Sequence, residues 1–409
     1  MVLHRYLGLT LAAFLLVAGS TGCVIAFYSE LDALLNPALH LARPPVAGAP
    51  ALEPVALHAR VQAQHPSQRV DIVMLRIEPE RSVVYFIDGR QVFVNPYNGD
   101  VMGSRKFGDL REGRKNLLTF VYELHYSLGL GKVGSYLFGG AALLWIFDCF
   151  VGAYLTFPPP TPRRAPVQRR RWLRRWASAW LLKTSQLFAL VFTWHRASGL
   201  WIWGMLLAFA WSGVALNLND SVYRPVMDAV LPANPANAKP ARLPRPRTAP
   251  KLDIQAALQR GRQLMADAAE RRAFRPIQER WLRYEPDSGS YNYTIESSRD
   301  LDERLPRTRV RFDGDDGRLL SFQAATGEGT REAFDTWLIA LHFGTIRQLG
   351  IAYRAVVSCL GVMVALLSVT GVWIWWRKRS KRSKRRGNTQ SASATSPAPT
   401  PDAAPTPTP

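Results

Sequence analysis

Four long stretches of the chain contain almost no ionisable side chains, and two long polar segments separate them. The apolar stretches are residues 6–28, 133–157, 199–218 and 355–376, and Asp148 is the one charged residue within them. An α-helix rises about 1.5 Å per residue, so about 20 apolar residues cross a hydrocarbon core roughly 30 Å thick. The pattern therefore predicts an α-helical membrane protein with four transmembrane helices, and it excludes a single soluble globule.

The two polar segments that follow the first and third stretches have the same order of predicted elements. A proline-rich linker comes first, a helix second, and short runs of β-branched and aromatic residues third, which are typical of strands joined by Asp-Gly and Asn-Gly turns. This order predicts one small α+β module in each segment. The linkers are 36–51 and 240–250, the helices 52–64 and 252–269, and the strands 70–77, 83–87, 92–95, 281–284, 291–296 and 308–312.

Histidines mark an internal duplication. His4 and His195, each followed by an arginine, stand at the start of the first and third spans, whereas His125 and His342 stand just before the second and fourth. The chain thus repeats a unit of span, module and span. The predicted segments are a first span at 1–28, a first module at 29–132, a second span at 133–157, a basic loop at 158–186, a third span at 187–218, a second module at 219–354, a fourth span at 355–376 and a basic, disordered tail at 377–409.

The formal net charge of +21 at first suggests a nucleic-acid-binding protein, but its distribution excludes that class. Residues 158–184 contain eight basic and no acidic side chains, and the tail after Trp376 contains eight basic side chains and one aspartate. Basic residues in short flanking loops mark the cytoplasmic side of a bacterial inner membrane. Both termini are therefore expected in the cytoplasm and both modules outside it, with the Arg/Trp-rich segment lying on membrane lipids.

The cysteines and the first apolar stretch agree with this arrangement. Cys23, Cys149 and Cys359 all fall within predicted spans, so the two modules are expected to fold without disulfides. The first stretch is longer than the apolar region of a cleaved signal peptide, which has roughly 7–15 residues. We therefore expect it to remain as a membrane helix.

The four span-end histidines are the strongest candidates for functional chemistry, because ionisable residues at membrane helix ends mark functional sites. His4, His125 and His195 are each followed four residues later by glycine. On a helix, residues i and i+4 lie on one face, so each such histidine would have a bare backbone patch one turn along, where a flat macrocycle fits. His342 lacks this glycine.

Sidedness sorts these histidines into a cytoplasmic pair, His4 and His195, and an external pair, His125 and His342. Two histidines facing each other across a helix bundle form a bis-axial site for non-covalent haem b, so two haems are predicted. The four histidines would be the axial iron ligands, and Arg5 and Arg196 would pair with haem propionates. The alternatives are interfacial polar residues or a divalent metal site, for which further ligands are lacking. His40, His58 and His65 are expected to be solvated.

Several motifs resemble the PepSY-associated membrane helix family of bacteria, often described as iron-regulated membrane proteins. The likeness covers about residues 3–378. Its motifs are Leu-His-Arg-x-x-Gly-Leu at 3–9, the strand-turn motifs at 92–100 and 310–318, Leu-His at 124–125, Trp-His-Arg-x-x-Gly-Leu at 194–200, Leu-His-x-Gly at 341–344 and the final run Thr-Gly-Val-Trp-Ile-Trp-Trp-Arg-Lys at 370–378.

The resemblance implies a fold of four spans with two PepSY-like modules and, for some members, a haem-containing siderophore reductase of the inner membrane. Such an enzyme would take electrons from a cytoplasmic or quinol donor and pass them to ferric iron in a periplasmic siderophore. The alternative implied by PepSY modules is a non-enzymatic membrane protein that regulates a peptidase or assists iron uptake. No hydrolytic constellation of residues is evident in the sequence.

Overall fold

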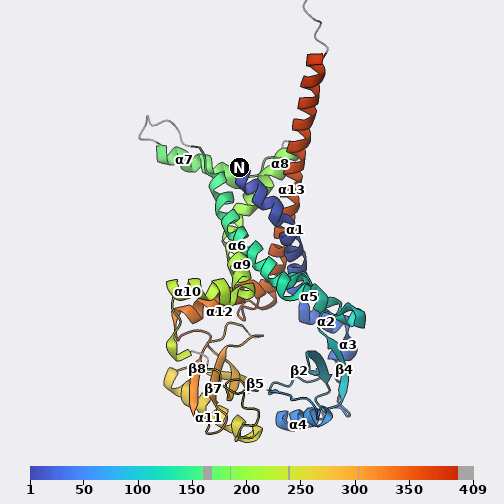
Figure 1. Cartoon of the computed structure of the whole chain (residues 1–409), viewed down its shortest axis with the longest axis vertical. Coiled ribbons are helices and arrows are strands. Elements are labelled where there is room, and N and C mark those ends of the chain that lie inside the picture. Colours follow the sequence, from blue (N-terminus) through green and yellow to red (C-terminus); the bar gives the residue numbers. More distant parts are fainter. Residues whose placement is uncertain (160–167, 185, 238–239, 303, 395–409) are drawn as a thin grey trace, which may run out of the picture.

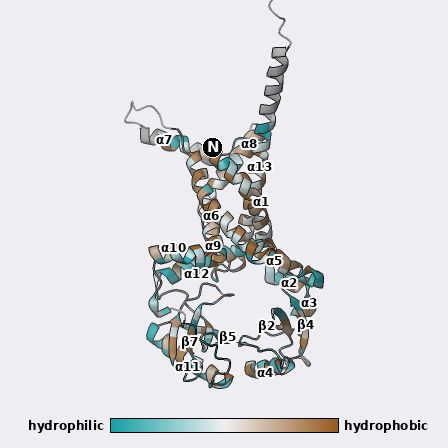
Figure 2. Ribbon diagram, in the orientation of Figure 1, coloured by the Kyte–Doolittle hydropathy of each residue, from teal (hydrophilic) through white to brown (hydrophobic). Residues whose placement is uncertain are grey.

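A helical stem carries two arms at one of its ends, and the N-terminus lies at the other end (Figure 1). The structure, a computed structural model, describes residues 1–159, 168–184, 186–237, 240–302 and 304–394. The stem contains helices α1 (Val2–Ile25), α6 (Gly131–Thr156), α8 (Leu187–Trp201), α9 (Trp203–Asn217) and α13 (Gly350–Ala394). Hydrophobic residues run along these helices, and hydrophilic residues are more frequent in the arms (Figure 2).

The stem has the length and the surface of a membrane-spanning bundle. Among the described residues, three helices are long and apolar enough to cross a membrane: α1, α6 and the part of α13 from Gly350 to Ser380. Their outward side chains are large and apolar, and lipid rather than water suits such a surface. Exposed examples are Leu16, Leu137, Phe147, Phe150, Val356 and Val369. The chain is therefore a multi-pass membrane protein with β-sheet regions outside the bilayer.

The third predicted span is not one helix. The helices α8 and α9 meet at Ile202 and are bent by 68° relative to each other. Ser198 and Gly199 lie just before the break, and the Ser198 hydroxyl donates to the carbonyl of Trp194 at 2.6 Å. Adjacent serine and glycine residues are a common cause of helix kinks, because the hydroxyl competes for backbone carbonyls and glycine resists bending least. Helices α8 and α9 form one membrane span only if the two helices together cross the bilayer.

The fourth span also differs from the prediction, because α13 continues through Ala394. The segment 377–394, expected to be part of a disordered tail, is helical, and residues 395–409 lie outside the described residues. Lysine and arginine are good helix formers, so a basic run can extend a stable helix beyond its apolar part. Part of the predicted basic loop, 160–167 and residue 185, also lies outside the described residues, and Gln168–Ala177 forms helix α7.

The first arm leaves α1 through helices α2 (Tyr28–Leu35) and α3 (Pro37–His40). Helix α4 (Pro54–Gln64) packs on the three-stranded antiparallel sheet of β2 (Val83–Ile87), β3 (Arg90–Val94) and β4 (Val101–Lys106), in that order. The core between helix and sheet contains Leu57, Val61, Val83, Tyr85, Val92 and Val94. Helix α5 (Leu117–Ser127) then leads the chain back to the stem.

The second arm leaves the stem through helix α10 (Arg224–Val230) and has helix α11 (Ile254–Arg272) packed on a five-stranded antiparallel sheet. Helix α12 (Thr330–Phe343) returns the chain to α13. The strand order is β1-β5-β6-β7-β8, with β1 (Ile72–Met74), β5 (Pro276–Glu285), β6 (Ser290–Ser297), β7 (Thr308–Asp313) and β8 (Leu319–Gln323). The predicted helix and all three predicted strands of this module are present, whereas β8 was not predicted.

One strand crosses between the arms. The run 70–77 was predicted as a strand of the first module, but only Ile72–Met74 is extended in a ladder, and it pairs with β5 of the second sheet. In the register, Ile72 lies opposite Arg283 and Met74 opposite Trp281. Strand pairing is decided by which sheet edge is within reach, and the residue pattern of a strand does not specify its neighbour. The two arms therefore share one sheet.

Helices α1 and α13 approach each other most closely where two glycines face each other. A Cβ on Gly19 would lie 2.6 Å from the carbonyl oxygen of Gly361, and a Cβ on Gly361 would lie 2.8 Å from that of Gly19. The Ser358 hydroxyl adds a hydrogen bond of 2.9 Å to the carbonyl of Cys23. Small residues at such a crossing allow membrane helices to pack backbone to backbone.

Substitution of Gly19 by alanine is expected to destabilise the stem by about 1–3 kcal/mol, because the added methyl group meets backbone atoms that cannot rotate away. Thermal unfolding of the detergent-solubilised protein would show the effect as a lower midpoint. The matched control is Gly140→Ala in α6, where no described atom lies within 4 Å of an added Cβ. Equal midpoints for the two variants would contradict the close packing of α1 on α13.

Candidate functional site

Two histidines that are far apart in the sequence meet at the end of the stem that contains the N-terminus. His4 lies in the first turn of α1, and His195 lies in α8. Their ring centres are 6.5 Å apart, and the ring planes are inclined by 56°. The rings come from helices that are far apart in sequence, so the bundle itself brings them together.

A second pair of histidines meets at the other end of the stem, where the arms begin (Figure 1). His125 lies in α5 and His342 in α12, the two short helices that return the chain from the arms. The ring centres are 6.2 Å apart, and the planes are inclined by 69°. The structure thus brings together the same two pairs of histidines that sidedness predicted.

The Nδ1 atom of every one of these histidines has a polar partner on another helix. Three partners are hydroxyl groups, and the fourth is a carboxylate. The distances are 2.8 Å from His4 to Asp148 Oδ1, 3.0 Å from His125 to Thr21 Oγ1, 2.9 Å from His195 to Thr370 Oγ1 and 2.6 Å from His342 to Ser212 Oγ. Metal-binding histidines usually engage their second ring nitrogen in this way, which orients the ring.

The hydrogen-bond network assigns the tautomer of the rings. Each hydroxyl donates its own proton to the carbonyl four residues earlier in its helix, so it can only accept from the imidazole. The carboxylate also accepts. Nδ1 is therefore assigned as the hydrogen-bond donor of all four rings, which leaves Nε2 as the ring atom that can bind a metal. The donations are Thr21 to Val17 at 2.6 Å, Thr370 to Leu366 at 2.7 Å and Ser212 to Ala208 at 2.7 Å.

The spacing of each pair suits one metal ion between the rings. If Nε2 of both rings binds a metal at about 2.0 Å, and each ring centre lies roughly 1.1 Å behind Nε2, the centres are roughly 6.2 Å apart. The observed separations are 6.5 and 6.2 Å. In the described part of the chain, no group of three or more His, Cys, Asp or Glu side chains gathers as a metal site. Haem iron needs only two axial protein ligands, because porphyrin supplies the other four.

Glycines lie against three of these rings, and two further glycines on α1 and α8 have open space beside them. A Cβ on Gly22, Gly152 or Gly371 would lie 3.0, 3.5 or 3.3 Å from Cε1 of His125, His4 or His195, respectively. No described atom lies within 4 Å of a Cβ on Gly8, and the nearest to one on Gly199 is Leu367 Cδ2 at 4.0 Å. The two predicted bare patches on α1 and α8 therefore exist, and the residues present fit a flat macrocycle.

The expected patch beside His125 is not there, because Gly129 is not on the same helix. Helix α5 ends at Ser127, and Leu128 and Gly129 both adopt positive φ angles, 54° and 69°. Gly129 instead belongs to the left-handed turn that ends the helix. Gly344 has the same role after His342, with φ of 71°. The His-x-x-x-Gly pattern alone does not distinguish a helix face from a helix end.

Sequence reasoning missed the residues that orient the rings. The Thr21 hydroxyl is hydrogen-bonded to Nδ1 of His125, and Gly22 lies against the edge of that ring. Thr370 and Gly371 make the same two contacts with His195. Ser212 is also followed by glycine. A hydroxyl residue followed by glycine inside an apolar stretch was thus the available signal, and it recurs in three of the four apolar stretches of the sequence.

The two arginines predicted to bind propionates have different surroundings. Arg5 places its guanidinium 4.8 Å from the ring centre of Tyr6, and its Nε is buried without a hydrogen-bond partner among the described residues. Arg196 already donates from Nε to the carbonyl of Ala179 at 3.1 Å and from Nη2 to that of Ser178 at 2.9 Å. Arg5 therefore retains more donors for an added anion than Arg196 does.

The prediction that the other three histidines are solvated is wrong for His58. Its side chain is buried, and burial lowers its pKa. It borders a cavity of about 440 Å³ between the arms, together with Arg69 and Tyr284. His40 is hydrogen-bonded to the buried Asp32 at 2.9 Å. Both side chains pack within the first arm.

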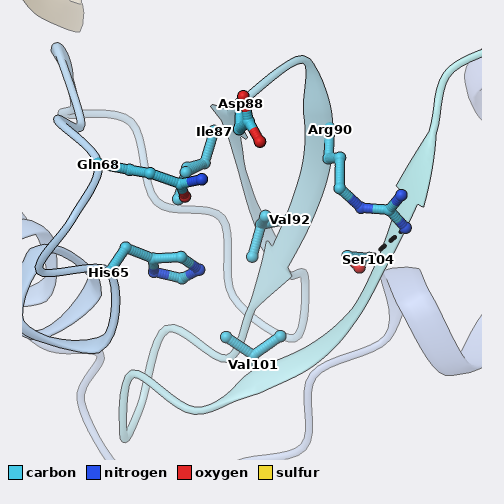
Figure 3. Close-up of a pocket in the computed structure, with 8 residues that line it drawn as sticks. All are labelled: His65, Gln68, Ile87, Asp88, Arg90, Val92, Val101 and Ser104. Atoms are coloured by element: carbon cyan, nitrogen blue, oxygen red, sulfur yellow. Dashed lines mark hydrogen bonds between the residues drawn. The ribbon is translucent and has the colours of Figure 1, made fainter.

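His65 lies in a second, smaller cavity on the first arm, of about 240 Å³ (Figure 3). The imidazole points toward Val92 and Val101, and Arg90 lies on the far side, where it donates to Ser104 at 3.3 Å. Arg90 also pairs with Glu112 at 2.7 Å. The Nδ1 atom of His65 lies 3.0 Å from the carbonyl oxygen of Val61, so both the imidazole and Arg90 already have partners within the protein.

Comparison with known proteins gives one result at the level of the family. No curated protein matches the chain. A family model, described as the PepSY-associated TM region, matches residues 1–378 and so covers the stem, both arms and all four histidines of the two pairs. The chain belongs to the family of proteins with a PepSY-associated TM region.

Proposed function

We propose that this protein is a haem-containing reductase of the bacterial inner membrane that passes electrons outward to ferric iron held by a periplasmic siderophore. The observation that carries the proposal is the arrangement of two histidine pairs, one at each end of the stem, with ring centres 6.5 and 6.2 Å apart. Each pair would hold one haem b, which accepts and releases one electron at a time when bound.

The topology part of the proposal counts four spans, with α8 and α9 together as the third, arranged as an internal duplication. The basic residues before α8 and at the end of α13 favour a cytoplasmic location for that end of the stem. The arms then lie in the periplasm. His4 and His195 would form the site where electrons enter, and His125 and His342 the site where they leave.

The chain's own residues would supply binding, orientation and insulation. The Nδ1 partners hold each imidazole in one tautomer with Nε2 toward the metal. Apolar side chains of the stem exclude water between the sites, and Arg5 and Arg196 would neutralise propionates at the cytoplasmic end. The donor would be a cytoplasmic reductant or quinol. The match to a dinucleotide-binding fingerprint at 129–134, Gly-Leu-Gly-Lys-Val-Gly, follows helix α5 and opens helix α6, so it lacks the strand that such a site requires.

The proposed acceptor is ferric iron rather than an organic group. One electron converts each Fe(III) to Fe(II), and no bond in the siderophore has to break. Siderophore oxygens are hard ligands that hold the ferric ion more strongly than the ferrous ion, so reduction loosens the chelate. The two arms stand beside the His125–His342 pair (Figure 1) and would form the surface on which a siderophore docks.

The decisive experiment uses the purified full-length protein in detergent. The dithionite-reduced protein, freed of excess dithionite, is mixed with a ferric hydroxamate siderophore and a coloured chelator of ferrous iron. We expect reoxidation of the haem spectrum together with about two ferrous ions per chain, one per haem. In His125→Ala, the rapid reoxidation of haem by the ferric siderophore should be lost. A colourless wild-type protein would instead favour a regulatory PepSY protein.

A further inference from the structure

One feature separates the two histidine pairs: among their four rings, His4 alone is hydrogen-bonded to a carboxylate of the described residues. Asp148 Oδ1 lies 2.8 Å from His4 Nδ1, whereas His125, His195 and His342 have neutral hydroxyl partners. We propose that Asp148 lowers the redox potential of the His4–His195 site below that of the His125–His342 site. This inference rests on the proposed haem-binding function and adds to it a direction for electron flow.

Asp148 is an unusual residue in its place. It is the one charged residue in the four apolar stretches of the sequence, and its side chain is 11% exposed in α6. An acid inside a membrane span costs free energy unless it is paired, and such residues are therefore functional candidates. Its hydrogen-bonded partner here is His4, whose ring centre lies 6.5 Å from that of His195, so the carboxylate stands directly behind this histidine pair.

The physical effect of the carboxylate follows from its charge. A negative acceptor draws the Nδ1 proton toward itself and makes Nε2 a stronger electron donor to a bound metal. The added negative charge also favours ferric over ferrous iron, because the ferric site carries one more positive charge. A hydroxyl acceptor is neutral and has neither effect to the same extent. Both effects lower the potential of the site that includes His4.

The difference in hydrogen-bond partners between the two sites favours electron transfer toward the arms. At the His125–His342 site, the hydroxyls of Thr21 and Ser212 accept the hydrogen bonds from Nδ1. Among the described residues, no carboxylate accepts a hydrogen bond from either ring. An electron that moves from the Asp148 end to the arm end therefore moves to the site with the higher potential. Asp148 is thus a positioning residue that acts through His4 and biases transfer outward.

The test is a redox titration of the purified full-length protein followed by its visible absorption. The wild type should titrate as two components of different midpoint potential. Asp148→Asn keeps an oxygen acceptor for Nδ1 but removes the charge, so the lower component should move upward. We expect the ferrous-to-ferric ratio of that haem to rise at least about tenfold at a fixed potential, which corresponds to about 59 mV for one electron.

Two controls make the outcome specific. Asp148→Glu keeps the charge, so its lower component should remain closer to the wild-type value than that of Asp148→Asn. Thr370→Val removes a neutral partner within the same site and should shift it less. If Asp148→Asn fails to retain the haem, Asp148→Thr gives His4 a hydroxyl partner like those of the other three rings and should also move the lower component upward; an unchanged midpoint in that variant would overturn the inference.

The outcomes distinguish this inference from the proposed function. A wild-type protein without haem would overturn both. Two bound haems whose midpoints are unchanged by Asp148→Asn would overturn the inference about Asp148 and leave the proposed function standing. An equal shift for Asp148→Asn and Asp148→Glu would also overturn it, because geometry rather than charge would then set the potential.

Discussion

Substitution of His125 by alanine is expected to remove one of the two proposed haems and to leave the other in place. The structure places the ring of His125 6.2 Å from that of His342, and the other pair lies at the far end of the stem. Alanine would remove one of the two proposed iron ligands at this site and would leave His4 and His195 unchanged. Haem content per chain, measured by absorption of the haem extracted into alkaline pyridine, should fall by about half.

Variants at the remaining positions make the pairing itself testable. His342→Ala should remove the same haem as His125→Ala, and the double variant should lose no more than either single one. His4→Ala and His195→Ala should each remove the other haem. His65→Ala in the first arm is the matched control, since its Nδ1 contacts only the carbonyl of Val61. Retention of two haems in His125→Ala would refute the site.

The second large effect is expected in the first arm, at a buried ion pair. Arg105 and Asp32 are both almost fully buried, and Arg105 Nη2 lies 2.6 Å from Asp32 Oδ2. Arg105 also donates to Gln91 Oε1 at 2.7 Å and to the carbonyl of Lys115 at 2.7 Å. The pair ties helix α2, which continues from the stem, to strand β4 of the sheet.

Replacement of Asp32 by alanine should destabilise the first arm by about 3–5 kcal/mol, because it leaves the Arg105 charge buried and unpaired. Hydrogen exchange of the β4 amides would show the loss as reduced protection. Asp220→Ala is the matched control, since it removes an exposed pair with Arg224 at 3.4 Å and should change protection by about 1 kcal/mol or less. Comparable effects of the two variants would contradict this account.

The same residue predicts how the arm responds to acid. Burial by itself would raise the pKa of Asp32, but hydrogen bonds and charge from His40 and Arg105 outweigh it and hold the pKa below its ordinary range. Asp32 therefore stabilises the arm above its unfolded-state pKa of about 3.9, and this contribution is lost as the pH falls toward the folded-state pKa. In Asp32→Asn this acid-dependent loss of protection should be absent.

Residue patterns were a good guide wherever a feature depends on local composition. The apolar stretches became stem helices, the predicted helices of the arms became α4 and α11, and the strand 83–87 is β2. Strand β4 was missed because Val101–Lys106 contains glycine, serine and two basic residues, which weaken a strand pattern. The break at Ile202 was missed because an apolar stretch looks the same whether or not it bends.

Charge and hydropathy along the chain determined which histidines share an end of the stem, since helix length and loop charge are properties of contiguous residues. Only the tertiary structure decided that the rings face each other, that Thr21, Ser212, Thr370 and Asp148 set their tautomers, and that β1 joins the sheet of the other arm. Those contacts depend on how helices rotate and cross and on which sheet edge lies within reach. Such relations join residues that are more than 100 positions apart, and no local pattern encodes them.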